Sequence, residues 1–205
     1  MMERNEDFSR LEISLPACLE NYRYFRSKLE SSTRLLVLVK ANAYGHGAVE
    51  FASLMEEAGA DYLAVAYPVE GFELRQAGIK SPIMVLTAGT DSFDQIVNYG
   101  LEPGIPNMYS LKVLCNVLEK RGMTDFPVHI KLDTGMHRLG FMTGELAELM
   151  DFVKECKAVK IKSIYSHLAA SDDPSCDEFT LGQIELFQKN ADALSESLGY
   201  KPMYH

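Results

Sequence analysis

The sequence predicts an α/β protein whose parallel sheet is covered by helices. Short apolar runs that suit buried strands alternate with stretches of helical periodicity along the chain, and this alternation is typical of βαβ units. Glycine follows the helical stretches, where a left-handed C-cap is expected. Two architectures fit this pattern, an open doubly wound sheet and a (β/α)8 TIM-type barrel. The barrel would be incomplete at its C-terminal end, because the chain has 205 residues and a closed barrel needs roughly 250.

The strand candidates are short apolar runs, as expected for a sheet that helices cover. They are Leu35–Val39, Tyr62–Ala66, Ile83–Leu86, Glu102–Ile105, Val128–Leu132 and Lys160–Tyr165. A seventh strand of the series is expected to begin within Lys201–His205, and a separate strand is expected at Arg10–Leu15, before the series.

Helical stretches separate the strands, and most of them end at a glycine. They are Glu50–Ala58 before Gly59, Val69–Ala77 before Gly78, Ser92–Tyr99 before Gly100 and Tyr109–Arg121 before Gly122. A first helix is expected from about Pro16 to Leu29. The last helix shows the three- and four-residue apolar steps most clearly, at Ile184, Phe187, Ala191, Leu194 and Leu198.

Composition excludes several classes of partner. The net charge is −9, which argues against a broad nucleic-acid-binding face. The four cysteines, Cys18, Cys115, Cys156 and Cys176, are widely spaced without a C-x-x-C pair, which favours reduced thiols over a disulfide framework or a zinc site. Residues 1–7 are charged and lack the apolar segment of a signal peptide, and no apolar run is long enough to span a membrane. We therefore expect a cytoplasmic protein with neither membrane nor nucleic acid as partner.

One lysine stands directly at the end of an apolar run. Leu35–Val39 leads into Lys40, and a glycine-containing turn with Tyr44 follows. A lysine placed there lies half in apolar packing, which favours the neutral amine. A neutral amine is a nucleophile that forms a Schiff base with a carbonyl group. A solvated lysine at a strand end is the alternative that these residues leave open.

Two more chemically capable side chains fall at or just past predicted strand ends. Arg138 and His167 share this placement with Lys40, and in a barrel the carboxyl ends of the strands carry the active site. Lys131 and Asp133 lie two apart, so on a strand they would share a face; a simple ion pair between them is one interpretation. A surface arginine and a core histidine remain the alternatives for Arg138 and His167. No metal site is expected.

Three segments resemble, in order and spacing, the signatures of the alanine racemase family. Leu35–Gly47 is similar to its pyridoxal-phosphate attachment motif, Lys131–Phe141 to its second signature, and Tyr165–Asp172 to its third. The resemblance spans nearly the whole chain and favours the barrel over the open sheet. It implies that residues 1–205 form the N-terminal pyridoxal-phosphate-binding barrel domain, truncated before its last units, and that the C-terminal β domain is absent from this sequence.

The resemblance also implies an activity and its partners. The expected reaction is the pyridoxal 5′-phosphate-dependent interconversion of L-alanine and D-alanine, which supplies D-alanine for peptidoglycan, in an enzyme that is a homodimer when complete. The family's second catalytic base, a tyrosine of the partner subunit, would lie beyond His205, as would a phosphate-binding Asn-Ser segment. This chain alone is therefore expected to have little or no racemase activity.

Five residues match family positions with a role at the site. Lys40 would hold the cofactor as a Schiff base and act as the base for the D-enantiomer. Tyr44 would donate a hydrogen bond to the cofactor phosphate. Arg138 would place substrate and cofactor, and His167 would pack near the pyridine ring. Lys131 matches a lysine that is often carbamylated in the family, which would turn it into an anion that holds Arg138.

Two other functions compete with this one. The chain resembles, in its length, a single-domain pyridoxal-phosphate-binding barrel protein without racemase activity, although that class lacks a signature like Lys131–Phe141. The second alternative is a non-catalytic α/β fragment whose lysines are structural.

Overall fold

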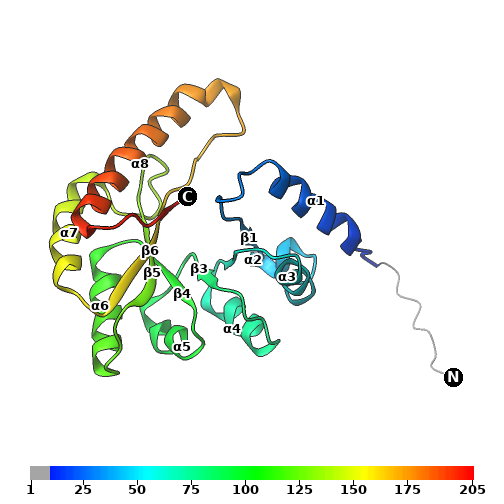
Figure 1. Cartoon of the computed structure of the whole chain (residues 1–205), viewed down its shortest axis with the longest axis horizontal. Helices are drawn as coiled ribbons and strands as arrows, with labels where there is room; N and C mark the ends of the chain where they lie inside the picture. The colour runs from blue at the N-terminus through cyan, green and yellow to red at the C-terminus, as the bar shows by residue number, and fades with distance from the viewer. Residues whose placement is uncertain (1–9) are drawn as a thin grey trace.

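A computed structural model describes residues 10–205 and decides between the two architectures. Seven parallel strands follow one another in the order β1 to β7, each paired with the next along the chain. A doubly wound sheet reverses its strand order at a switch point, and the seven strands show no such reversal. The sheet curls into an incomplete barrel with helices on its outside (Figure 1). The predicted incomplete TIM-type barrel is confirmed. Residues 1–7, on which the expectation about a signal peptide rests, lie outside the described residues.

The seven strands lie close to their predicted positions, and the start of the seventh within residues 201–205 is confirmed. Their bounds are β1 Leu36–Leu38, β2 Tyr62–Val65, β3 Ile83–Val85, β4 Glu102–Ile105, β5 Phe126–Lys131, β6 Val159–Tyr165 and β7 Met203–Tyr204. The helices are α1 Leu15–Ser27, α2 Lys40–Tyr44, α3 Ala48–Glu57, α4 Pro68–Gln76, α5 Phe93–Asn98, α6 Met108–Lys120, α7 Leu146–Glu155 and α8 Asp177–Leu198. Within this described part, no helix is both long and apolar enough to cross a membrane.

Alternate residues of each strand serve two different layers. Leu63, Val65 and Val85 point outward into the main core, which lies between the sheet and its covering helices. Ala64, Met84 and Tyr165 form a separate buried cluster on the inner face of the curl. This alternation follows from the two-residue period of a strand, and it leaves the inner face free to carry polar groups as well.

The strand expected at Arg10–Leu15 is wrong. Residues 10–14 have no strand partner, and Leu11 is exposed. The side chain of Ser14 instead accepts a hydrogen bond from the Ala17 amide and caps helix α1. A short segment forms a strand only where a neighbouring strand supplies backbone hydrogen bonds, and residues 10–14 have no such neighbour.

The glycines that follow the helices confirm the predicted helix ends. Gly59, Gly78, Gly100, Gly122 and Gly199 all have positive φ angles. The last helix differs from its prediction in one detail, because Ile184 is exposed whereas its neighbour Gln183 is buried. The apolar periodicity correctly predicts the helix, but it misplaces the buried face at its N-terminal end.

A chain of hydrogen bonds crosses the inner face of the sheet. Glu102 accepts from the Tyr62 hydroxyl at 3.2 Å and lies 3.0 Å from His129 Nε2. Nδ1 of His129 lies 2.7 Å from the Ser163 hydroxyl, which in turn lies 2.9 Å from His205 Nε2. The His205 ring stacks on Tyr165 with centroids 5.0 Å apart. Burial, helped by the nearby His129, lowers the pKa of His205 to about 4.

The free energy of unfolding should fall as the pH is lowered from about 6.5 toward 4. Unfolded His205 takes up a proton near its ordinary pKa of 6.5, whereas folded His205 resists protonation until about pH 4, so lowering the pH through this range favours the unfolded chain. Denaturant unfolding between pH 7 and 4.5 measures the slope. His205→Phe, which keeps a ring over Tyr165, should flatten it. The same change at the exposed His46 should not, and equal slopes in both variants would contradict the assignment.

Candidate functional site

Lys40 lies two residues after the end of β1, at the rim where the carboxyl ends of the strands meet. The amide of Val39 donates to the carbonyl of Ala64 in β2 at 2.8 Å and holds the end of the strand in place. The chain then makes a left-handed turn, because residues 41–44 all have φ angles between 50° and 55°. Left-handed conformation costs roughly 1–2 kcal/mol per non-glycine residue, so neighbouring groups must stabilise the turn.

Glu70 of helix α4 supplies part of that stabilisation. One oxygen of its carboxylate accepts from the Ala41 amide at 2.6 Å. The other oxygen accepts from the amides of Ala66 and Tyr67 at 2.7 and 2.9 Å. A single carboxylate therefore links the turn after β1 to the turn after β2. Sequence reasoning missed Glu70, and the one local signal for it is its place at the third position of helix α4, three residues after the N-cap Tyr67.

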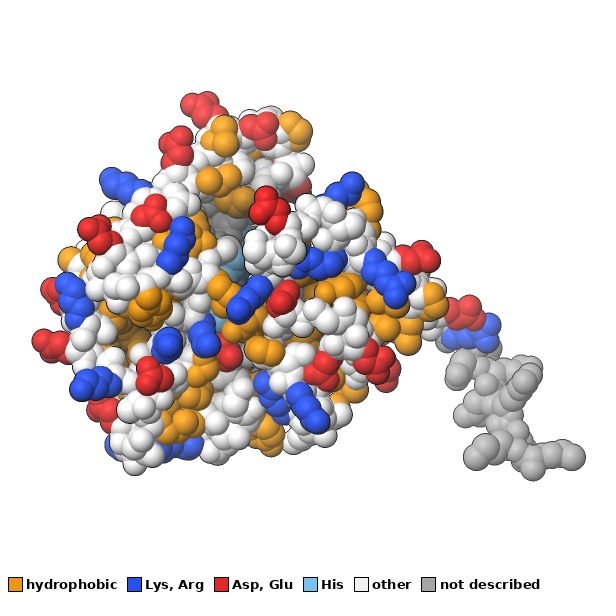
Figure 2. All heavy atoms as spheres, in the orientation of Figure 1, with side chains coloured by type: hydrophobic (Ala, Val, Ile, Leu, Met, Phe, Trp, Pro, Cys, Tyr) orange, Lys and Arg blue, Asp and Glu red, His pale blue; other side chains and the backbone are white. Residues whose placement is uncertain are grey.

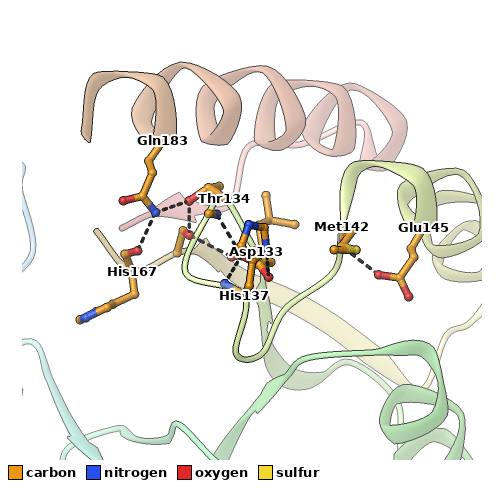
Figure 3. Close-up of polar contacts among 10 residues, drawn as sticks. Asp133, Thr134, His137, Met142, Glu145, His167 and Gln183 are labelled. Carbon is orange, nitrogen blue, oxygen red and sulfur yellow. Dashed lines mark hydrogen bonds and ion pairs between the residues drawn. The ribbon is translucent and has the colours of Figure 1, made fainter. Parts of the chain in front are cut away.

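Arg138 lies in the loop after β5, and Asp133 shapes this loop. Oδ1 of Asp133 accepts from the amides of Gly135 and His137 at 2.9 and 3.1 Å (Figure 3). The base of the loop closes where Phe141 donates to the carbonyl of Lys131. Burial alone would raise the pKa of Asp133, but the two amides and the adjacent His137 ring lower it below its ordinary value.

The ion pair considered for Lys131 and Asp133 does not form. Lys131 is the last residue of β5, so Asp133 lies in the loop and the two residues do not share a strand face. The carboxylate of Asp133 pairs with His137 at 3.3 Å. Lys131 is 8% exposed, and its Nζ lies 5.7 Å from the centre of the Tyr165 ring. A buried lysine thus lies at the rim without that carboxylate as its partner.

One cavity of about 520 Å³ collects most of the predicted residues. Its charged lining residues are Lys40, Lys131 and Arg138, and His167 lines it beside them. No carboxylate lines this cavity among the residues that the structure describes. Figure 2 shows a hollow near the middle of this face of the molecule with histidine atoms visible inside it. The arrangement suits an anionic ligand.

The charges of the cavity act on one another. Burial lowers the pKa of Lys131, and the nearby Arg138 lowers it further, while Asp133 opposes the shift. Burial also lowers the pKa of His167, followed by the positive charges of Lys131, Arg138 and Lys40. The neighbouring cations therefore favour the neutral forms of Lys131 and His167, and an anion bound in the cavity would oppose this effect.

Tyr44 is the predicted site residue that does not line the cavity. Its ring lies 5.8 Å from Nζ of Lys40, but the side chain is 59% exposed. It borders a separate, mostly apolar hollow of about 430 Å³ between α1, β1 and α3. The structure thus brings four of the five predicted residues to one cavity and places Tyr44 next to it.

Comparisons with known protein families agree with the geometry. The family model described as alanine racemase, N-terminal domain, matches residues 13–205. The chain is 38% identical over 197 residues to the alanine racemase of Synechocystis sp., covering 95% of this chain and 52% of that protein. It is 40% identical over 167 residues to the alanine racemase of Nostoc sp., covering 80% of this chain and 43% of that protein.

Solved structures give the same result. The alanine racemase of Clostridium difficile in complex with cycloserine superposes with a TM-score of 0.86 at 30% identity, covering 92% of this chain and 52% of that one. The enzyme from the D-cycloserine producer Streptomyces lavendulae superposes with a TM-score of 0.86 at 29% identity, covering 93% and 50%. The chain spans about half the length of the relatives it matches.

Removing one cavity charge should shift the titration of His167. In Lys131→Met the pKa of His167 should rise toward its ordinary value, because a positive neighbour that disfavours the imidazolium is gone. Lys40→Met should raise it less, since Lys40 contributes least of the three cations. Titration followed by NMR measures both values. Lys112→Met, which removes an exposed lysine paired with Glu148, is the control, and a His167 pKa unmoved by all three changes would contradict this electrostatic coupling.

Proposed function

We propose, for a chain that belongs to the alanine racemase family, that the protein interconverts L-alanine and D-alanine with pyridoxal 5′-phosphate. In this proposal residues 1–205 provide the cofactor-binding barrel domain, and the working enzyme is a cytoplasmic homodimer. The observation that carries the proposal is the strand-end Lys40 in a cavity lined by cations without a carboxylate. The match to racemases over residues 13–205 favours this function over a barrel protein that only binds the cofactor.

The lining of the cavity suits the cofactor in its charge and in its apolar surface. Pyridoxal phosphate carries a phosphate and a phenolate, and the lining cations Lys40, Lys131 and Arg138 would neutralise them. The ring of Tyr165 and the side chain of Leu86 add an apolar lining for an aromatic ring. When bound, the cofactor supplies an electron sink for the carbanion that remains after the α-proton leaves.

The residues of this chain have distinct tasks in the proposed reaction. Lys40 would hold the cofactor through its amine, which condenses with an aldehyde with loss of water. As a free amine it would exchange a proton with the α-carbon on one face of the substrate. The Arg138 guanidinium offers two parallel N–H groups to a carboxylate or phenolate. His167 would pack beside the cofactor ring, and Tyr44, next to the cavity, would donate a hydrogen bond to the phosphate.

Lys131 is proposed to carry a carbamate. Its buried amine has a lowered pKa and faces Arg138, so the neutral amine nitrogen can attack carbon dioxide. An N–C bond forms, one proton is released, and a carbamate anion results. The product would be an anion beside the guanidinium and would replace repulsion with attraction.

Borohydride reduction in the presence of pyridoxal phosphate should label Lys40. Peptide mass mapping then locates the label, because reduction makes the bond between lysine and cofactor permanent. Lys40→Ala should abolish the label, and Lys112→Ala, which removes an exposed lysine, should not. If the label is found on another lysine and not on Lys40, the proposal is wrong.

Carbon-13 bicarbonate should produce one carbamate signal in the NMR spectrum of the protein. The signal should grow with bicarbonate concentration and be absent from Lys131→Met, since the amine that reacts is gone. It should persist in Lys112→Met. A spectrum in which Lys131→Met retains the signal would assign the carbamate to a different lysine.

A further inference from the structure

Gln183 of helix α8 is a buried amide that touches the two loops carrying Arg138 and His167. Its side chain is 1% exposed, and Figure 3 shows it extending from α8 toward His167 and Thr134. We propose that Gln183 is a positioning residue, which sets the placement of the two loops relative to each other and so the shape of the cationic cavity. The inference rests on the proposed function only for the identity of the molecule that the cavity binds.

The amide of Gln183 makes three hydrogen bonds and uses its full donor capacity. Oε1 accepts from the Ala169 amide at 2.9 Å. Nε2 donates to the His167 carbonyl at 3.1 Å and to the Thr134 hydroxyl at 3.2 Å. The bonds to residues 167 and 169 resemble the two-point pairing of a neighbouring strand, so the side chain extends the sheet's hydrogen bonding past the end of β6.

The third bond continues into a chain with one consistent direction. The Ser166 hydroxyl donates to the Leu132 carbonyl at 2.9 Å. Its single proton is then used, so the Thr134 hydroxyl must donate to Ser166 at 2.8 Å. Thr134 in turn can only accept from Nε2 of Gln183. A primary amide is the one neutral side chain of this length that supplies an acceptor and two donors together.

Helix α8 also packs closely on the loop that carries Arg138. Gly135 has a φ of 143°, and a Cβ atom there would lie 3.0 Å from the Phe179 ring and 3.5 Å from Cγ of Gln183. Asp133 accepts from the amides of Gly135 and His137, so one carboxylate ties Thr134 to the part of the loop that leads to Arg138. Losing the amide would leave buried donors and acceptors unpaired at the foot of both loops, which is costly.

Hydrogen exchange of three backbone amides tests this role without any ligand. In Gln183→Met, which removes all three bonds, the amide of Ala169 loses its acceptor and should exchange about tenfold faster, as expected for one lost hydrogen bond. The amides of Gly135 and His137 keep Asp133 as their acceptor, but they should also exchange faster because their loop loses the contact through Thr134. In Gln183→Glu the carboxylate still accepts from Ala169 but cannot donate. The amide of Ala169 should then keep its protection, while those of Gly135 and His137 lose theirs.

Gln188→Met provides the matched control, because Gln188 lies on the same helix, is exposed and bonds only to Asp192 at 2.8 Å. Its exchange rates at the three amides should equal those of the wild type. Wild-type rates in both Gln183 variants would overturn the proposal. So would the failure of both variants to unfold cooperatively, because Gln183 would then be part of the general core.

Cofactor binding provides a second and separate readout. Titration with pyridoxal phosphate, followed by circular dichroism of the bound cofactor, should show about tenfold weaker retention in Gln183→Met and an altered signal, with the label still on Lys40. Accelerated exchange with unchanged retention and an unchanged signal would refute positioning of the cavity. If the wild-type chain fails to label Lys40, the proposed function fails, while the exchange experiment still decides the role of Gln183.

Discussion

Uncompensated positive charge at the rim of the barrel is the constraint on which the site depends. Lys40, Lys131 and Arg138 line one cavity without a carboxylate, and burial of Lys131 makes the repulsion stronger. Two acids do lie nearby, but both are engaged elsewhere. Glu70 accepts from backbone amides after β1 and β2, and Asp133 does so after β5. The carboxylates hold the loops in shape, and the cations remain available for an anionic ligand.

The carboxylate of Glu70 also explains why the strained turn after Lys40 is stable. Four consecutive left-handed residues would not be stable in isolation. They lie between a strand end paired to β2 and a carboxylate anchored on helix α4. The turn directs the chain away from the strand immediately after the lysine, so the side chain of Lys40 faces the cavity and that of Tyr44 does not.

On the inner face of the sheet, Tyr165 lies between the cationic cavity and the chain of hydrogen bonds that ends at His205. Tyr165 lines the cavity, stacks on His205 and has a buried hydroxyl without a partner among the described residues. Gly104 makes room for this hydroxyl, because a Cβ atom at that position would collide with it. Packing against glycine and stacking on His205, rather than hydrogen bonding, therefore hold Tyr165 under the cationic residues.

Local sequence determined the elements and the positions of the chemistry. Apolar runs and glycine caps were sufficient for the strands and most helix ends, because both depend on neighbours within a few residues. They also placed Lys40 and His167 just past strand ends and Arg138 in the loop after β5, and parallel pairing then gathered the three at one rim. The spatial order of the strands follows their order in the sequence, and this excluded the open sheet. That order became known only from the strand pairing in the structure.

Tertiary structure alone decided which groups met. The pattern at Arg10–Leu15 predicted a strand, but pairing needs a neighbour that the fold does not provide there. The Lys131–Asp133 spacing suggested an ion pair, but β5 ends at Lys131 and loop amides claim the carboxylate. Gln183 was not predicted, because it lies next to the apolar positions of the last helix and its partners Thr134 and His167 are distant in sequence. Contacts between residues far apart along the chain depend on how the helices pack against the sheet. No local sequence pattern determines this packing.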